Sequence, residues 1–92
     1  MIKSYKHKGL KEVFDKGKSK KINSQHWARI AEMLDELDAA TIAEDMDMPG
    51  YDFHGLKGKR QNDWSVAVRA NWKITFRFED GNAYIVNYED YH

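Results

Sequence analysis

The sequence predicts an α+β fold in a single domain over residues 1–92, with two or three N-terminal helices packed on a small, mainly antiparallel sheet of four to five strands. Two observations support this prediction. In the first half of the chain, apolar residues recur at the three- and four-residue spacing of a buried helix face. From about residue 51 onward they alternate with polar residues, as in strands with one buried face. Helices followed by a run of strands are typical of the α+β class.

The first half of the chain predicts an extended lead and then the helices. Residues 2–5 form the lead, and the helix after it ends at Gly17, since glycine accepts the left-handed backbone of a helix stop. A second helix, capped by Asn23 or the residue after it, is expected over 24–38, with apolar residues on one face and acidic residues on the other. A further short helix is expected over 39–48, before a Pro-Gly pair.

The second half predicts four strands of an antiparallel meander. The boundaries follow from a basic loop over 57–62, a turn at Asn71-Trp72 and a hairpin at Asp80-Gly81. The strands themselves are expected over 51–56, 64–69, 73–79 and 83–88. The last strand delivers the final three residues of the sequence to the rim of the sheet.

Composition excludes several classes of site. The chain has no cysteine, which excludes disulfides, thiol catalysis and thiolate metal sites. No pair of histidines has metal-binding spacing, and no Gly-rich phosphate loop follows a strand. No apolar run approaches the roughly 20 residues of a membrane span, and the first residues lack a signal-peptide core. We therefore expect a soluble, cytoplasmic protein with no metal, no other cofactor and no membrane partner.

The net charge is zero, but the charges are segregated along the chain. Residues 1–21 carry eight lysines against two acids, and residues 22–53 carry one arginine against eight acids. Residues 54–77 are basic again, and the remainder is acidic. The basic blocks are suited to contact with a phosphate backbone, although for either block taken alone we favour the interpretation that it is a solvated face.

Several residues with acid/base or cationic side chains are expected at one rim of the sheet. An antiparallel meander can gather them into one concavity: His54, Lys57, Arg69, Lys73, Asp90, Tyr91 and His92. Cleavage of RNA without a metal needs a base for the 2′-hydroxyl proton, cations for the phosphorane, and an acid for the leaving 5′-oxygen. Such a site would be restricted to RNA, because DNA lacks the 2′-hydroxyl.

Each of these residues also has a plainer interpretation. A lone strand histidine such as His54 is commonly a satisfied polar residue. Trp64 and Trp72 are expected to pack in the core or at a sheet edge, although an exposed Trp72 could stack on a base. We expect His26 to be a surface or packing residue and His7 to be solvated.

Three runs of the sequence closely resemble the HigB branch of the RelE toxin superfamily. They are HGLKG at 54–58, WSVAVRANWKITF at 64–76 and AYIVNYEDYH at 83–92, and the opening residues 1–11 are similar as well. The resemblance implies a microbial RNase fold of the RelE type. It also implies a ribosome-dependent endoribonuclease that cuts mRNA in the A site, contacts small-subunit ribosomal RNA, inhibits translation, and is neutralised by a HigA-like helix-turn-helix antitoxin.

The resemblance also implies an active site. It places there His54, Lys57, Asp90, Tyr91 and His92. Arg69 and Asn71 fall in the family's mRNA-contacting segment, and Lys73 stands where relatives often carry arginine, so the bidentate fork for phosphate is lost. On this pattern His92 is the base, oriented by Asp90, His54 is the acid, Lys57 and Arg69 stabilise the phosphate, and Tyr91 orients the RNA. The acid and base roles could be exchanged.

Two other classes of function remain as alternatives. One is a non-catalytic toxin resembling the gyrase-poisoning ParE branch, which lacks the acid/base residues. The other is a non-catalytic RNA-binding module, which would show salt-sensitive RNA binding and no cleavage. We expect the toxin alone to be monomeric and its complex with the antitoxin to be a hetero-oligomer.

Overall fold

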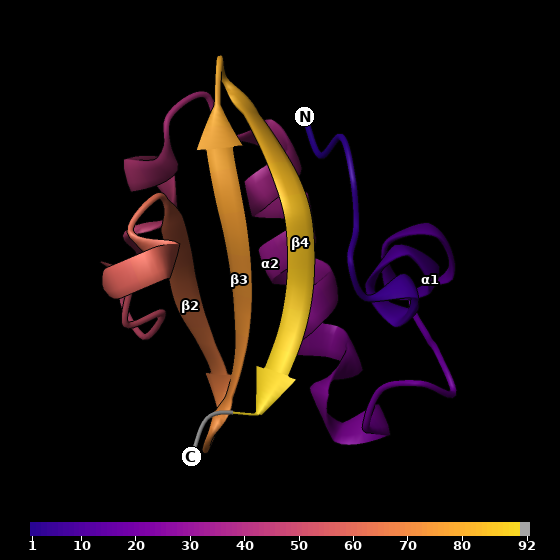
Figure 1. The fold of residues 1–92 in the computed structure, drawn as a ribbon. Helices are drawn as coiled ribbons and strands as arrows, with labels where there is room; N and C mark the ends of the chain where they lie inside the picture. Colours follow the sequence, from indigo (N-terminus) through magenta and orange to yellow (C-terminus); the bar gives the residue numbers. More distant parts are fainter. Residues whose placement is uncertain (91–92) are drawn as a thin grey trace.

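The computed structural model describes residues 1–90, which form two α-helices and a four-stranded sheet (Figure 1). The helices are α1 (Lys8–Lys16) and α2 (Trp27–Ala39), and 3₁₀ turns lie at η1 (Ser24–His26), η2 (Ala43–Met46) and η3 (Gly58–Arg60). The strands are β1 (His54–Gly55), β2 (Asp63–Arg69), β3 (Trp72–Glu79) and β4 (Asn82–Asp90). Each strand pairs antiparallel with the next in the order β1-β2-β3-β4, which confirms the predicted α+β meander.

The core lies between α2 and one face of the sheet. In Figure 1, α2 lies behind the strands, and α1 lies beside β4. Alternate residues of the strands face the helices because successive side chains of a strand point to opposite sides. Val66, Ile74 and Phe76 are fully buried in this layer, together with Ile30 and Leu34 of α2.

Two tight turns set the register of the meander. Asp80 and Gly81 have φ angles of 51° and 77°, the two positive values of the hairpin turn that the sequence predicts. The other turn lies one residue earlier than predicted, because Trp72 is already the first residue of β3. Ala70 takes the left-handed backbone there, with φ 52°.

The predicted strand over 51–56 is wrong in its length. Only His54–Gly55 pair with β2. The chain turns just before them, where Asp52 has a φ of 47°, outside the range of a strand. The residues on either side still pack inward, since Tyr51 is buried and Phe53 stacks on the tryptophan of β2 with ring centroids 4.9 Å apart.

The helix predicted over 39–48 is reduced to the turn η2. The Asp45 carboxylate accepts the backbone N–H groups of residues 41 and 42 at 2.9 and 3.3 Å, which holds this turn in place. The other two helix predictions are confirmed: α1 is followed by Gly17 with φ 80°, and the Asn23 side chain caps the turn that leads into α2. Within residues 1–90, no helix has both the length and the apolar character that a membrane crossing requires.

Residues 1–6 run alongside β4, and residues 2 and 5 form parallel bridges to it (Figure 1). The hydroxyl oxygen of Ser4 accepts the Ile85 N–H at 2.8 Å, and the Ser4 carbonyl accepts the Val86 N–H at 3.1 Å. Ile85 has a φ of 55°, which is rare for a β-branched residue, and it lies where the β3–β4 register shifts. Ser4 therefore satisfies the backbone of a bulge in β4.

Candidate active site

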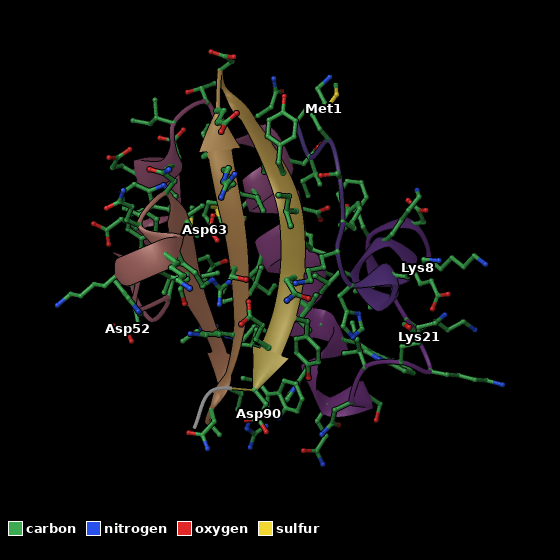
Figure 2. All side chains as sticks on the ribbon, viewed as in Figure 1. Met1, Lys8, Lys21, Asp52, Asp63 and Asp90 are labelled. Carbon is green, nitrogen blue, oxygen red and sulfur yellow. The ribbon has the colours of Figure 1, made fainter. Side chains whose placement is uncertain are left out.

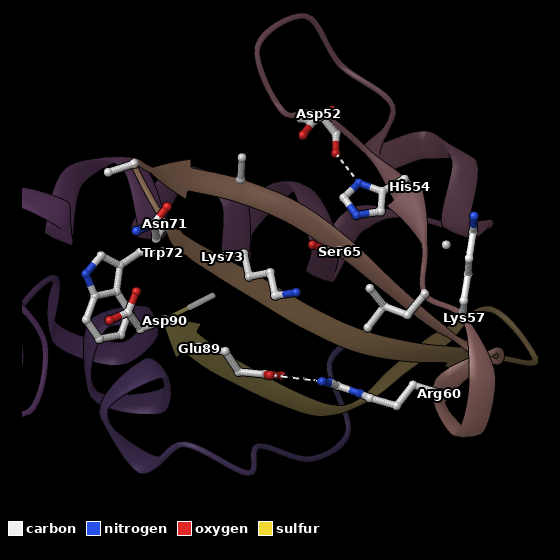
Figure 3. Close-up of a pocket in the computed structure, with 14 residues that line it drawn as sticks. Asp52, His54, Lys57, Arg60, Ser65, Asn71, Trp72, Lys73, Glu89 and Asp90 are labelled. Atoms are coloured by element: carbon white, nitrogen blue, oxygen red, sulfur yellow. Dashed lines mark hydrogen bonds and ion pairs between the residues drawn. The ribbon is translucent and has the colours of Figure 1, made fainter. Parts of the chain in front are cut away.

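A pocket of about 720 Å³ opens on the face of the sheet turned away from α2 (Figure 3). Strand alternation explains its place: Val66 and Ile74 point to the helices, so their neighbours Ser65 and Lys73 point to the pocket. The lining residues are Asp52, His54, Gly55, Leu56, Lys57, Arg60, Ser65, Ala67, Ala70, Asn71, Trp72, Lys73, Glu89 and Asp90.

His54 lies at one end of the pocket, on β1. Its Nδ1 is 2.9 Å from the backbone carbonyl oxygen of Asp52. Because a carbonyl only accepts, Nδ1 carries the hydrogen, and Nε2 is left for the pocket (Figure 3). A neutral His54 can take a proton at Nε2, and a protonated one can donate it. No motif or spacing in the sequence indicates that Asp52 orients this ring.

The structure brings most of the predicted site residues to this pocket. Lys57 lies at the His54 end, Lys73 extends along the middle, and Asn71 and Asp90 lie at the far end (Figure 3). Two of the predicted site residues, Tyr91 and His92, lie outside the described residues. Over residues 1–90, no three histidine or acidic side chains lie close enough to hold a metal ion.

Arg69 does not line the pocket. The β2–β3 register shifts between Ala67 and Arg69, so Ala67 pairs with Lys73 but Arg69 pairs with Trp72. This irregularity moves Arg69 off the face that Ala67 and Lys73 share. The pKa of His26, on the helix side of the sheet, is lowered mainly by burial. The positive charge of Arg69 is the second cause.

An ion-pair network that the sequence did not predict lies along one side of the pocket. Arg60 of η3 donates Nη1–H and Nη2–H to the two carboxylate oxygens of Glu89 at 2.9 and 2.7 Å. Its Nη2 also donates to Thr75 Oγ1 at 3.2 Å, and Thr75 donates its hydroxyl to Glu89. The Asp63 carboxylate accepts hydrogen bonds from Arg60 Nε at 3.5 Å and from Arg77 Nε at 3.2 Å. Arg60 thus contacts β2, β3 and β4 in turn.

Hydrogen bonds from Arg60 hold the pKa of Glu89 at about 2, and that from Thr75 acts in the same direction. Glu89 is therefore ionised at neutral pH and is unsuited to be the proton donor of this site. No local sequence signal indicates the pair, because its members are 29 residues apart and come from different elements, η3 and β4.

Aromatic rings support the far end of the pocket from the helix side. The Trp72 ring stacks on Tyr88 with centroids 4.4 Å apart, and the Tyr88 hydroxyl lies 2.6 Å from Nδ1 of the buried His26. His26 is thus a packing residue, one of the two roles expected for it. The prediction that His7 is solvated is wrong: it is half-buried, its Nδ1 accepts the Gly9 N–H at 3.1 Å, and its ring meets Tyr88 edge-on.

The N-terminal basic block lies apart from the pocket. Figure 2 shows Lys8 and Lys21 on the α1 side of the molecule, whereas Asp52 lies on the opposite side. Within this block, Lys21 pairs with Glu12 at 2.7 Å, and Lys11 pairs with Asp15 at 2.9 Å. The two basic blocks of the sequence therefore form separate surfaces.

Comparisons with known proteins agree with the resemblance seen in the sequence. A family model described as a RelE-like toxin of the type II toxin–antitoxin system HigB matches residues 3–92. The chain is also 51% identical to a protein of Proteus vulgaris named Endoribonuclease HigB, over 92 residues that cover all of both chains.

Proposed function

Because this chain belongs to the HigB-like family of RelE-like toxins from type II toxin–antitoxin systems, we propose that it is an endoribonuclease that cleaves mRNA in the ribosomal A site and so inhibits translation. The observation that carries this proposal is the pocket, which combines an oriented imidazole, two lysines and an aspartate on one face of the sheet. The similarity to an endoribonuclease over the full chain supports the same activity.

The reaction proposed is attack of a ribose 2′-hydroxyl on the adjacent phosphate. A base takes the hydroxyl proton, the new oxygen–phosphorus bond displaces the 5′-oxygen, and an acid protonates that leaving oxygen. The products are a 2′,3′-cyclic phosphate and a 5′-hydroxyl. We assign the acid to His54, through Nε2, and the base to His92, oriented by Asp90, with Tyr91 orienting the RNA; the two histidine roles are exchangeable.

Lysines are proposed to hold the reacting phosphate. Lys57 and Lys73 line the pocket at its His54 end and along its middle (Figure 3). Positive charge there stabilises the phosphorane more than the ground state, which lowers the barrier. We propose that Asn71 and Trp72, at the far end, contact the neighbouring nucleotide, and that Arg69 contacts RNA from outside the pocket.

The spacing of the strands sets how RNA would lie. His54 and Asp90 are on β1 and β4, which are separated by three strand spacings, or about 14 Å. Groups at these two positions would approach one scissile phosphate from opposite sides rather than contact each other, because the attacking 2′-oxygen and the leaving 5′-oxygen are bonded to the same phosphorus. RNA is therefore expected to cross the open face of the sheet from β1 towards β4.

Dependence on the ribosome follows from the openness of the site. The pocket lies on one sheet face and offers few side chains to hold a flexible strand, so presentation in the A site would supply the alignment. The test is to compare cleavage of one message, naked and on translating ribosomes, by purified protein. Equal rates and positions in both contexts would contradict the ribosome dependence.

The decisive variants replace the two histidines. We expect His54→Ala and His92→Ala to lower the cleavage rate by at least about 10²-fold, the scale of general acid–base groups. His54→Gln is the matched control, because glutamine can hydrogen bond but cannot titrate, and it should be as inactive as alanine. Mapping of 5′ ends in cells should show in-frame cuts with wild type only. Inhibition of DNA gyrase instead would favour the ParE-like alternative.

A type II toxin is paired with an antitoxin, and here we propose a HigA-like helix-turn-helix protein as that partner. The toxin alone is expected to be a monomer and the complex a hetero-oligomer. Light scattering of the separate and co-expressed proteins measures both masses. A stable toxin dimer in the absence of the antitoxin would contradict this proposal.

A further inference from the structure

The two ends of the pocket lie on segments that differ in how extensively they pair with the rest of the sheet. The Asp90 end is carried by β4, which pairs with β3 along most of its length. The His54 and Lys57 end is carried by the loop after β1 and by β1 itself, which pairs with β2 at two positions and is flanked by one backbone hydrogen bond to β2 on each side. Gly58 in this loop has a φ of 69°, a left-handed conformation that glycine adopts without a steric cost. This end is therefore joined to the sheet by fewer backbone contacts than the Asp90 end.

Arg60 crosses the sheet and joins the two ends. Its guanidinium lies bidentate on the Glu89 carboxylate at 2.9 and 2.7 Å, although η3 and β4 lie on opposite sides of β2 and β3 (Figure 3). The Glu89 side chain is only 22% exposed, and Thr75 donates a further hydrogen bond to it. A guanidinium that binds a carboxylate through two hydrogen bonds, with a hydroxyl as a third donor, has a defined geometry. A single surface ion pair does not.

Each member of the pair is linked directly to a proposed catalytic residue. The Arg60 N–H donates to the Lys57 carbonyl at 3.4 Å, so both residues belong to one turn. Glu89 immediately precedes Asp90 on β4. We propose that Arg60 and Glu89 are positioning residues that hold the His54–Lys57 end of the active site at a fixed distance from the Asp90 end. This inference rests on the proposed endoribonuclease function.

Two other roles for the pair make different predictions. If Arg60 only attracted RNA by its charge, the Arg60→Lys variant would keep the wild-type cleavage rate, and removal of the Glu89 charge would accelerate cleavage. If Glu89 donated a proton, its pKa would have to lie far above the value of about 2 that Arg60 imposes. Positioning instead requires the fork and the carboxylate together, so both Arg60→Lys and Glu89→Gln should slow cleavage.

The experiment measures single-turnover cleavage of ribosome-bound mRNA as a function of toxin concentration. We expect Arg60→Lys and Glu89→Gln each to lower the rate at saturation by about tenfold or more, because small misplacements of catalytic groups have effects of this size. The half-saturating concentration should change by less than about twofold. The double variant should be no slower than the single ones, since one interaction is lost in each case.

Lys59→Ala is the control, because it removes a cationic side chain from the same turn but leaves the Arg60–Glu89 pair intact, and Lys59 does not line the pocket. It should keep the wild-type rate. Thermal unfolding of every variant checks that the fold is retained. A wild-type rate in Arg60→Lys, or a wild-type or faster rate in Glu89→Gln, would overturn the proposal.

Amide hydrogen exchange tests the positioning role without any catalysis. The Leu56 N–H donates to the Asp63 carbonyl at 2.9 Å, and the Gln61 N–H donates to the Gly58 carbonyl at 3.2 Å, so both report on the loop. These amides should exchange faster in Arg60→Lys and Glu89→Gln but not in Lys59→Ala. Unchanged exchange would overturn the positioning role. Absence of cleavage by the wild type would instead count against the proposed function, and the exchange data would still decide on the pair.

Discussion

The two faces of the sheet are built from the same strands but are held together by different forces. On the helix face, Val66, Ile74 and Phe76 are at most 1% exposed and form a dry layer with α2. On the other face, Lys73 and Glu89 pair across β3 and β4 and line a pocket open to solvent. Adjacent residues of one strand therefore serve different purposes. Hydrophobic burial on one face supplies stability, and the polar groups of the other face line the proposed active site.

Truncation of the helix face should have the largest effect. Phe76→Ala removes a fully buried ring, and we expect it to lower the free energy of unfolding by about 3–5 kcal/mol. Arg77→Ala, the neighbouring residue in β3, loses a partly exposed ion pair with Asp63 and should lower it by less than about 1 kcal/mol. Urea unfolding of both variants measures the difference. Equal losses would show that the two faces do not divide these roles.

Tyr88→Phe tests the polar contact within the helix face. It removes the hydroxyl that lies 2.6 Å from Nδ1 of His26 and leaves a buried ring nitrogen without this partner. We expect the free energy of unfolding to fall by about 1–3 kcal/mol, the usual range for an unsatisfied buried group. Urea unfolding against wild type is the measurement, and a variant as stable as wild type would mean that the hydrogen bond contributes nothing net.

A smaller effect is expected from pH. Burial, with the charge of Arg69 second, lowers the pKa of His26, so the unfolded state binds a proton more readily than the folded state. The corresponding stability is present above the unfolded pKa of about 6.5 and is lost as the pH falls below it. Urea unfolding between about pH 7.5 and 5.5 should therefore show decreasing stability.

The His26→Gln variant should reduce this pH dependence, since glutamine is neutral throughout and can still contact the Tyr88 hydroxyl. His7, whose pKa is also lowered by burial and by Lys21, should account for part of the slope that remains. An unchanged slope in His26→Gln would contradict the assignment.

The smallest change in stability is expected on the pocket face. Lys57 is exposed, so Lys57→Ala should change the free energy of unfolding by no more than about 0.5 kcal/mol. Its cleavage rate on ribosome-bound mRNA should fall by about tenfold or more, because one phosphate-stabilising charge is lost. If the cleavage rate of Lys57→Ala fell only in proportion to the loss of folded protein, the assignment of stability to one face and activity to the other would be contradicted.

Much of the fold was predictable from the sequence because its signals are local. The spacing of apolar residues predicts both helices, and Asp80-Gly81 predicts the last hairpin with its two positive φ angles. The family motifs identify His54, Lys57, Asn71, Lys73 and Asp90, and the structure brings these five residues to one pocket.

The remaining features depend on contacts that no local pattern encodes. Alternation along β2 places Arg69 on the pocket face, but the register shift after Ala67 reverses it. The Arg60–Glu89 pair joins residues far apart in sequence, and the carbonyl that orients His54 belongs to a residue with an unusual backbone, Asp52. Sequence periodicity carries no information about either contact.

The pairing of residues 1–6 with β4 has a consequence for the order in which the chain folds. The hydrogen bond between Ser4 and Ile85 spans 81 positions, so residues 1–6 can complete their pairing only after β4 has been synthesised. Contacts of such long range slow folding, because the intervening chain must be ordered first. On the ribosome, α1 and α2 emerge early, but the sheet and its pocket can be completed only after β4 has left the exit tunnel. Until then the nascent chain would lack the complete pocket and, with it, the proposed cleavage activity.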